Sequence, residues 1–155
     1  MELARNLKIE SVSRLDLSQP ELLRPTDSVA DAVKRMQVRG IGCVVVCDGK
    51  RAAGIFSERD LMTKVLEPGL PLTLPLSQVM TTPPVTVHRT EPIASALRLM
   101  QKGGYRHLPV VDESGAPVGL LSVKRIINYM VEHFPAMIYN LPPKPAAAPQ
   151  AREGA

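Results

Sequence analysis

The stretch that decides the fold is Gly54-Ile55-Phe56-Ser57-Glu58-Arg59-Asp60, in which an apolar strand pattern runs directly into a serine. Ser57 precedes a helical pattern, and Asp60 follows three residues later, which is the spacing of a helix N-cap and its capping-box carboxylate. Backbone N–H groups at the beginning of a helix also favour an anion such as a phosphate. The stretch therefore predicts either a simple capping box or a turn that holds a ligand.

A second copy of this stretch, Gly119-Leu120-Leu121-Ser122-Val123-Lys124-Arg125, lies 65 residues downstream. It keeps the glycine, the apolar pair and the serine, but Arg125 stands in the place of Asp60. Upstream, seven identities recur at an offset of 64 residues: Thr26/Thr90, Ala30/Ala94, Ala32/Ala96, Met36/Met100, Gln37/Gln101, Gly40/Gly104 and Asp48/Asp112. Agreement in both identity and order indicates an internal duplication.

Each copy predicts the element order β-α-β-β-α. In the first, a helix begins after Ser28 and ends at Gly40, strands cover 43–47 and 51–56, and a helix covers 58–65. In the second, the strands are 85–87, 108–111 and 117–121, and the helices run from Thr90-Glu91-Pro92 to Gly103-Gly104 and over 124–131. One half cannot cover its sheet alone. We therefore expect a mixed α/β (α+β) fold in which the two repeats pack sheet to sheet about a pseudo-two-fold axis.

The expected organisation has five parts. They are an N-terminal segment (1–22), a first repeat (23–68), a Pro-containing linker (69–76), a second repeat (77–134) and a flexible Ala/Pro-rich tail (135–155). In the first part, Leu3, Leu7 and Ile9 fit a strand or a short helix that covers an edge.

Composition excludes several classes of protein. The 155 residues carry a modest net charge of +4, without a basic run or an aromatic platform for nucleic acid. Cys43 and Cys47 share one strand, about 13 Å apart at about 3.3 Å per residue, too far for a disulfide. Two buried free thiols, with no signal peptide and no membrane-length apolar run, predict a cytoplasmic protein.

Catalytic and metal-binding patterns are also absent from the sequence. His88, His107 and His133 are too scattered to indicate a metal cluster. No nucleophile elbow, P-loop or dinucleotide fingerprint occurs, and no carboxylate pair resembles an acid–base couple. We therefore expect no enzyme activity and no metal.

The duplicated pattern resembles a tandem pair of cystathionine β-synthase (CBS) domains, also called a Bateman module, over about residues 20–134. The resemblance rests on the paired Gly-apolar-apolar-Ser turns, on Gly-Tyr-Arg-His-Leu-Pro-Val-Val-Asp (104–112), and on Val79-Met80-Thr81 leading into Val85-Thr86-Val87. It implies regulatory binding of an adenosine compound (AMP, ADP, ATP or S-adenosylmethionine) between the repeats, without catalysis or a further cofactor.

The first expected cleft depends on Asp60, because an ionised carboxylate can accept hydrogen bonds from the adjacent 2′ and 3′ hydroxyls of a ribose. In the family, this turn faces the strands of the other repeat. The resemblance therefore implies a ligand site made of Ile55, Ser57, Arg59, Asp60, Met80, Tyr105, Arg106, His107 and Pro109. Arg106 and His107 would donate hydrogen bonds to the phosphate. The alternatives are that Arg106 is a solvated charge at the sheet edge and that His107 is a hydrogen-bonded strand histidine. Ile55 and Met80 would flank the adenine or belong to the core.

The second expected cleft comprises Thr26, Ser122, Lys124 and Arg125 and departs from the family pattern. Arg125 cannot accept hydrogen bonds from a ribose, and two cations at a helix N-terminus are unfavourable unless an anion is near. Either this cleft is empty, or its cations reach the phosphates of a ligand held by the first. We expect one good site per chain.

The function expected from these patterns is that of a stand-alone adenosine-ligand sensor. It would signal through a change of shape or of partner affinity, and the resemblance implies a homodimer. The alternative is a structural or protein-interaction module whose clefts bind nothing. Nucleic-acid binding is the least favoured hypothesis.

Overall fold

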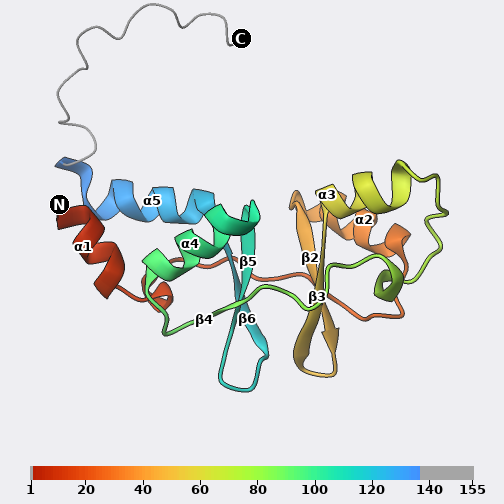
Figure 1. Cartoon of the computed structure of the whole chain (residues 1–155), viewed down its shortest axis with the longest axis horizontal. Helices are drawn as coiled ribbons and strands as arrows, with labels where there is room; N and C mark the ends of the chain where they lie inside the picture. The colour runs from red at the N-terminus through yellow and green to blue at the C-terminus, as the bar shows by residue number, and fades with distance from the viewer. Residues whose placement is uncertain (1, 137–155) are drawn as a thin grey trace, which may run out of the picture.

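The computed structural model describes residues 2–136, in which the two repeats lie next to each other along the long axis (Figure 1). The first repeat contains two helices, two further helical turns and three strands. In chain order these are β1 (Leu22–Leu23), α2 (Val29–Arg39), β2 (Cys43–Asp48), β3 (Arg51–Ser57), α3 (Glu58–Asp60), the π-helical η2 (Leu61–Leu66) and the 3₁₀ turn η3 (Leu76–Gln78).

The second repeat has the same order of elements. They are β4 (Val87–His88), α4 (Ile93–Gly103), β5 (His107–Val111), β6 (Pro117–Ser122) and α5 (Val123–His133). Two short elements precede both repeats, α1 (Glu2–Ile9) and the 3₁₀ turn η1 (Val12–Arg14). The internal duplication in the sequence is therefore also a duplication in the structure.

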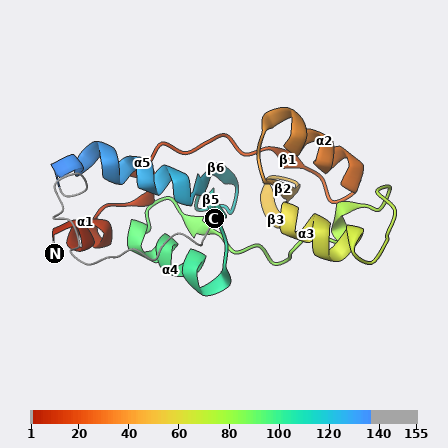
Figure 2. The same ribbon diagram turned by 90° about the horizontal axis from the view of Figure 1, so that it is seen from above.

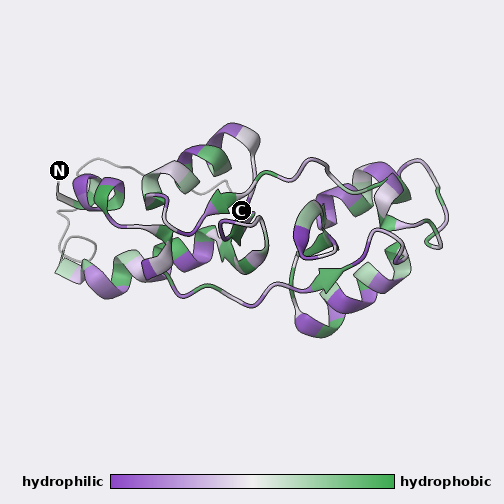
Figure 3. Cartoon of the chain, turned by 90° about the horizontal axis from the view of Figure 1, so that it is seen from below, coloured by the Kyte–Doolittle hydropathy of each residue, from purple (hydrophilic) through white to green (hydrophobic). Residues whose placement is uncertain are grey.

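Each repeat forms its own three-stranded sheet, β1-β2-β3 and β4-β5-β6. The first two strands of each sheet are parallel and joined through a helix, whereas the second and third form an antiparallel hairpin. The helices of each repeat lie beside the sheet of the same repeat (Figure 2). Figure 3 shows hydrophobic and hydrophilic residues alternating along the helices, and the buried residues of α2 and α4 are all apolar.

Side chains at helical spacing build the core of each repeat. Val29, Ala32 and Met36 of α2 are buried against strand residues such as Phe56. Ser28 begins this helix with a capping box, and Gly40 ends it at φ 65°, a left-handed conformation that favours glycine. These are the residues that the sequence predicts for the two ends of the helix.

The two sheets meet through a small apolar cluster. Cys43, Val45 and Cys47 of β2 pack with Leu120 of β6, and the Ala52 N–H donates to the Gly115 carbonyl at 3.0 Å. The mixed α/β fold with two repeats packed sheet to sheet is therefore confirmed. Both cysteines are buried and free, as their spacing predicts.

Two extended segments connect the two repeats through backbone hydrogen bonds. Thr81 exchanges two backbone hydrogen bonds with Ile55 of β3, at 2.8 and 3.0 Å. In the same way Ser18 exchanges two with Leu120 of β6, at 2.9 and 3.2 Å. The chain leading into one repeat thus pairs with the hairpin of the other, which brings residues of both repeats to the same cleft.

Some element boundaries differ from the prediction. Of the two alternatives expected for the N-terminal segment, a strand or a short helix, the structure has the short helix, α1, which packs beside α4. The strand expected at 85–87 is the shorter β4, at Val87–His88. The helix after Ser57 is α-helical only as far as Asp60 and then continues as the π-helical η2.

Within the described residues, no helix is both long and apolar enough to cross a lipid bilayer. The expected tail at 135–155 lies, apart from its first two residues, outside the part of the chain that the structure describes.

Candidate functional site

A cavity of about 420 Å³ lies between the two repeats. Both repeats and the segment that joins them contribute to its wall. The lining residues are Gly40, Ile41, Gly42, Cys43, Ile55, Ser57, Glu58, Arg59, Asp60, Thr81, Val85, Gly104, Tyr105, Arg106, His107 and Leu108. The volume falls within the range of small-molecule sites.

Asp60 lines this cavity and is only 6% exposed. Its Oδ2 accepts hydrogen bonds from the backbone N–H of Ser57 at 2.9 Å and from the Ser57 hydroxyl at 3.1 Å. Its Oδ1 accepts from the Thr81 hydroxyl at 2.9 Å and lies 3.1 Å from Lys64 Nζ. The carboxylate is therefore held in one orientation by partners from β3, from η2 and from the segment that precedes β4.

The capping box and the ligand-holding turn prove compatible. The Asp60 N–H donates to the Ser57 hydroxyl at 3.2 Å, which completes a reciprocal capping box. At the same time both residues line the cavity. Ser28 and Asp31 form an equivalent box at the start of α2, yet neither lines this cavity.

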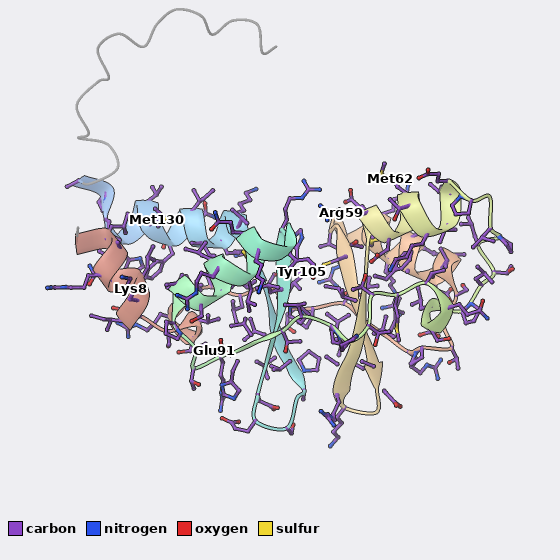
Figure 4. The ribbon with its side chains drawn as sticks, in the orientation of Figure 1. Lys8, Arg59, Met62, Glu91, Tyr105 and Met130 are labelled. Carbon is purple, nitrogen blue, oxygen red and sulfur yellow. The ribbon has the colours of Figure 1, made fainter. Side chains whose placement is uncertain are left out.

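The opposite wall comes from the second repeat and carries its positive charge. Arg106 and His107 line the cavity at the beginning of β5. Arg59, from the first repeat, donates from its guanidinium to the Gly104 carbonyl at 3.1 Å. Arg59 and Tyr105 lie at the facing edges of the two repeats (Figure 4). Arg59 thus bridges the cleft, whereas Arg106 is exposed and available to an anion.

Burial changes the acid–base behaviour of two lining residues. Burial lowers the pKa of His107, the nearby Arg106 charge lowers it further, and Glu58 partly opposes the shift. Burial, with Glu58 and Asp60 nearby, raises the pKa of the Cys43 thiol to about 12. At neutral pH both side chains are therefore uncharged, and His107 offers a neutral imidazole to the cavity.

The structure brings most of the expected first cleft together. Ile55, Ser57, Arg59, Asp60, Tyr105, Arg106 and His107 all line the cavity. Met80 and Pro109 are not among the lining residues. Met80 packs against Gly54 and the core of the first repeat, and Pro109 is buried within β5 opposite Leu120.

Sequence reasoning missed four residues around Asp60. Thr81 and Lys64 contact the carboxylate, and Glu58 and Gly42 line the cavity. A Cβ at Gly42 would lie 2.8 Å from Glu58 Oε1, so the glycine leaves room for that side chain. Lys64 follows Asp60 by four residues, a spacing typical of a helical ion pair, and could have been found. Thr81 could not, because its contact depends on the packing of a distant segment.

The second expected cleft is arranged differently. The Ser122 hydroxyl accepts from the Arg125 N–H at 3.2 Å and caps α5. The Arg125 guanidinium pairs with Asp16 of the N-terminal segment at 2.9 Å. Thr26 is exposed in the turn before α2, and within 2–136 no hydrogen bond joins it to Ser122, Lys124 or Arg125. Arg125 has thus acquired an anionic partner from the chain itself.

No three His, Cys, Asp or Glu side chains of the described residues are grouped so that they could hold a metal ion.

The CBS domain model matches residues 12–67 and 76–132, which together make up most of the sequence. The chain therefore belongs to the CBS domain family, as a tandem pair.

Two relatives are similar to this chain over most of its length. An uncharacterised protein of Methanopyrus kandleri is 31% identical over 126 residues, which cover 80% of this chain and 63% of that protein. The meiotically up-regulated gene 70 protein of Schizosaccharomyces pombe is 35% identical over 117 residues, 74% of this chain but only 16% of that protein. The chain thus spans less than two thirds of these relatives.

Among solved structures, a CBS domain protein from Pyrobaculum aerophilum complexed with AMP is 27% identical. It superposes with a TM-score of 0.70 over 75% of this chain and 89% of that chain.

Proposed function

We propose that this CBS pair is a regulatory module that binds an adenosine-containing ligand, either an adenine nucleotide or S-adenosylmethionine, in the cavity between its repeats. The ligand is an effector rather than a cofactor, and the proposal gives no residue a catalytic role. Binding would change the conformation or the partner affinity of the module, which requires that the ligand prefer one of two states.

One observation carries this proposal. A fixed carboxylate, Asp60, lies in the wall of an inter-repeat cavity whose other wall presents Arg106 and His107. Carboxylate oxygens suit the hydroxyls of a ribose, and a guanidinium suits a phosphate. The AMP complex of the Pyrobaculum aerophilum relative supports the same ligand class.

The test is calorimetric titration with AMP, ADP, ATP and S-adenosylmethionine, using Asp60→Ala and a matched control. Asp31→Ala removes the same capping-box carboxylate from α2 but leaves the cavity untouched. We expect Asp60→Ala to lose at least tenfold in affinity and Asp31→Ala to bind like the wild type. Equal binding by all three folded proteins would refute the assignment of Asp60.

The alternative function, a protein-interaction module without a ligand, is favoured by a different observation. All the hydrogen-bonding positions of Asp60 already have partners within the chain. Thermal-shift measurements with millimolar AMP, ADP, ATP, NAD and S-adenosylmethionine separate the two functions, because a ligand that binds only the folded state raises its melting temperature. No shift with any ligand would favour the interaction module.

The proposal includes a homodimer in the cytoplasm. Met62, Leu66 and Ile127 are each more than half exposed on η2 and α5. The helical layers of both repeats lie along the same edge of the molecule, where Figure 4 labels Met62 and Met130. A second copy covering this edge would remove apolar surface from water. Light scattering after gel filtration tests the dimer, and Met62→Asp should weaken it.

A further inference from the structure

The side chain of Lys64 pairs with Asp60, which lines the cavity, although Lys64 itself is not a lining residue. Its Nζ is 3.1 Å from Asp60 Oδ1 and 3.2 Å from the Thr81 hydroxyl. The Lys64 side chain is 41% exposed, whereas that of Asp60 is 8% exposed. An exposed cation is thus paired with a buried carboxylate that lines the cavity.

The carboxylate of Asp60 has no acceptor position to spare. Its two oxygens offer about four lone-pair sites. Four donors use them, namely the Ser57 N–H, the Ser57 hydroxyl, the Thr81 hydroxyl and the Lys64 ammonium. A ligand hydroxyl can therefore bind Asp60 only when one of these donors leaves.

Lys64 is the donor that leaves at the lowest cost. The Ser57 N–H belongs to the backbone, and the Ser57 hydroxyl also accepts from Asp60 N–H. Thr81 is fixed by two backbone hydrogen bonds to Ile55. The Lys64 ammonium, in contrast, can rotate into water, where it is fully hydrated, and a half-exposed ion pair contributes little.

We propose that Lys64 is an internal competitor of the ligand, whose ammonium occupies on Asp60 the position that a ribose hydroxyl takes in the complex. This inference rests on the proposed function, since it concerns how the same cavity admits an adenosine ligand. Lys64 acts through Asp60 and is a positioning residue. It lowers the affinity for ligands with a free diol and leaves ligands without hydroxyls unaffected.

The competition lowers the affinity of the site and makes that affinity depend on the hydroxyls of the ligand. A ligand binds Asp60 only if its hydroxyls interact more favourably with the carboxylate than the ammonium that they replace. Breaking the ion pair between Lys64 and Asp60 therefore reduces the net binding free energy of the diol. Removing the cation abolishes this cost, so the affinity rises. Since an exposed ion pair contributes up to about 1 kcal/mol, the gain is about three- to fivefold.

The experiment compares Lys64→Met with the wild type by calorimetry, using AMP and 2′,3′-dideoxy-AMP. Lys50→Met is the matched control, because Lys50 is exposed in the turn between β2 and β3 and its loss changes the net charge equally. We expect the Kd for AMP to fall about three- to fivefold in Lys64→Met, with no change for dideoxy-AMP. Lys50→Met should match the wild type with both ligands.

Other outcomes overturn the inference in different ways. Weaker AMP binding by Lys64→Met would make Lys64 a direct ligand contact. An equal gain for AMP and dideoxy-AMP would indicate a general effect of charge. An unchanged Kd in the variant, beside a wild type that binds AMP, refutes the competition but keeps the proposed function. If the folded proteins bind neither these two ligands nor ADP, ATP or S-adenosylmethionine, the proposed function itself fails.

Discussion

Asp60→Ala should destabilise the fold much more than Asp31→Ala, although both residues occupy the same position in a capping box. Asp31 is exposed, and its carboxylate accepts one hydrogen bond, from the Ser28 N–H at 3.2 Å. An exposed bond of this kind contributes about 0.5–1 kcal/mol to the free energy of unfolding. Asp60 is buried and serves four donors, so its loss has further consequences.

The magnitude for Asp60→Ala follows from what each donor loses. The partly buried Ser57 N–H and Thr81 hydroxyl lose their acceptors, and leaving buried donors unpaired costs about 1–3 kcal/mol. Lys64 is already half exposed, so its ammonium is hydrated and contributes less than about 1 kcal/mol. We therefore expect Asp60→Ala to lower the free energy of unfolding by about 2–4 kcal/mol, which is about 2 kcal/mol more than Asp31→Ala.

The assay is urea unfolding of the ligand-free proteins, followed by far-ultraviolet circular dichroism. Similar slopes for the three proteins would show that the midpoints report stability rather than a changed unfolded state. The reasoning would be refuted if the two variants differed by less than about 0.5 kcal/mol, because Asp60 would then act only as a helix cap.

Three further predictions concern residues near the cleft. Gly54→Ala should cost about 1–3 kcal/mol, because the new Cβ would lie 2.6 Å from Met80 Sδ and 3.1 Å from the Thr81 carbonyl oxygen. A Met80→Ala background should reduce that cost in urea unfolding, and an unchanged cost would contradict the steric cause. The Cys43 thiol, whose pKa is raised to about 12 by burial, should not react with a disulfide reagent at pH 8 until the chain unfolds. Burial lowers the pKa of His107, so the unfolded chain binds a proton that the folded chain excludes, and stability should fall as the pH drops below about 6.5. His107→Gln should flatten this dependence between about pH 5 and 7, and an equal slope in the variant would assign it to another group.

The two repeats share one architecture but have diverged at their clefts. In the first repeat, the helical carboxylate Asp60 accepts a hydrogen bond from the Thr81 hydroxyl and forms an ion pair with Lys64. In the second, a base on the helix, Arg125, meets the acid Asp16 of the segment that crosses over it. This exchange of charge satisfies Arg125 within the chain and supports one ligand site per chain as part of the proposal.

Local patterns predicted much of the fold. Helical spacing of apolar residues, the glycine at the end of α2 and the β-branched run of β2 placed the elements of both repeats. These features depend on neighbours within a few positions, so the sequence carries them directly. The duplication then predicted the sheet-to-sheet arrangement, because half a sequence of this length cannot cover its own sheet.

The environment of Asp60 was decided by the tertiary structure. The Ser57 contact lies three positions away and was predictable, but Thr81 is 21 positions away and reaches Asp60 only because its segment pairs with β3. The Arg59 bond to Gly104 spans 45 positions, and the Arg125 bond to Asp16 spans 109. Such contacts depend on how the repeats pack together, which no local spacing encodes. The sequence thus determined two duplicated halves and a capped turn, and only the packing of those halves decided which side chains surround the carboxylate.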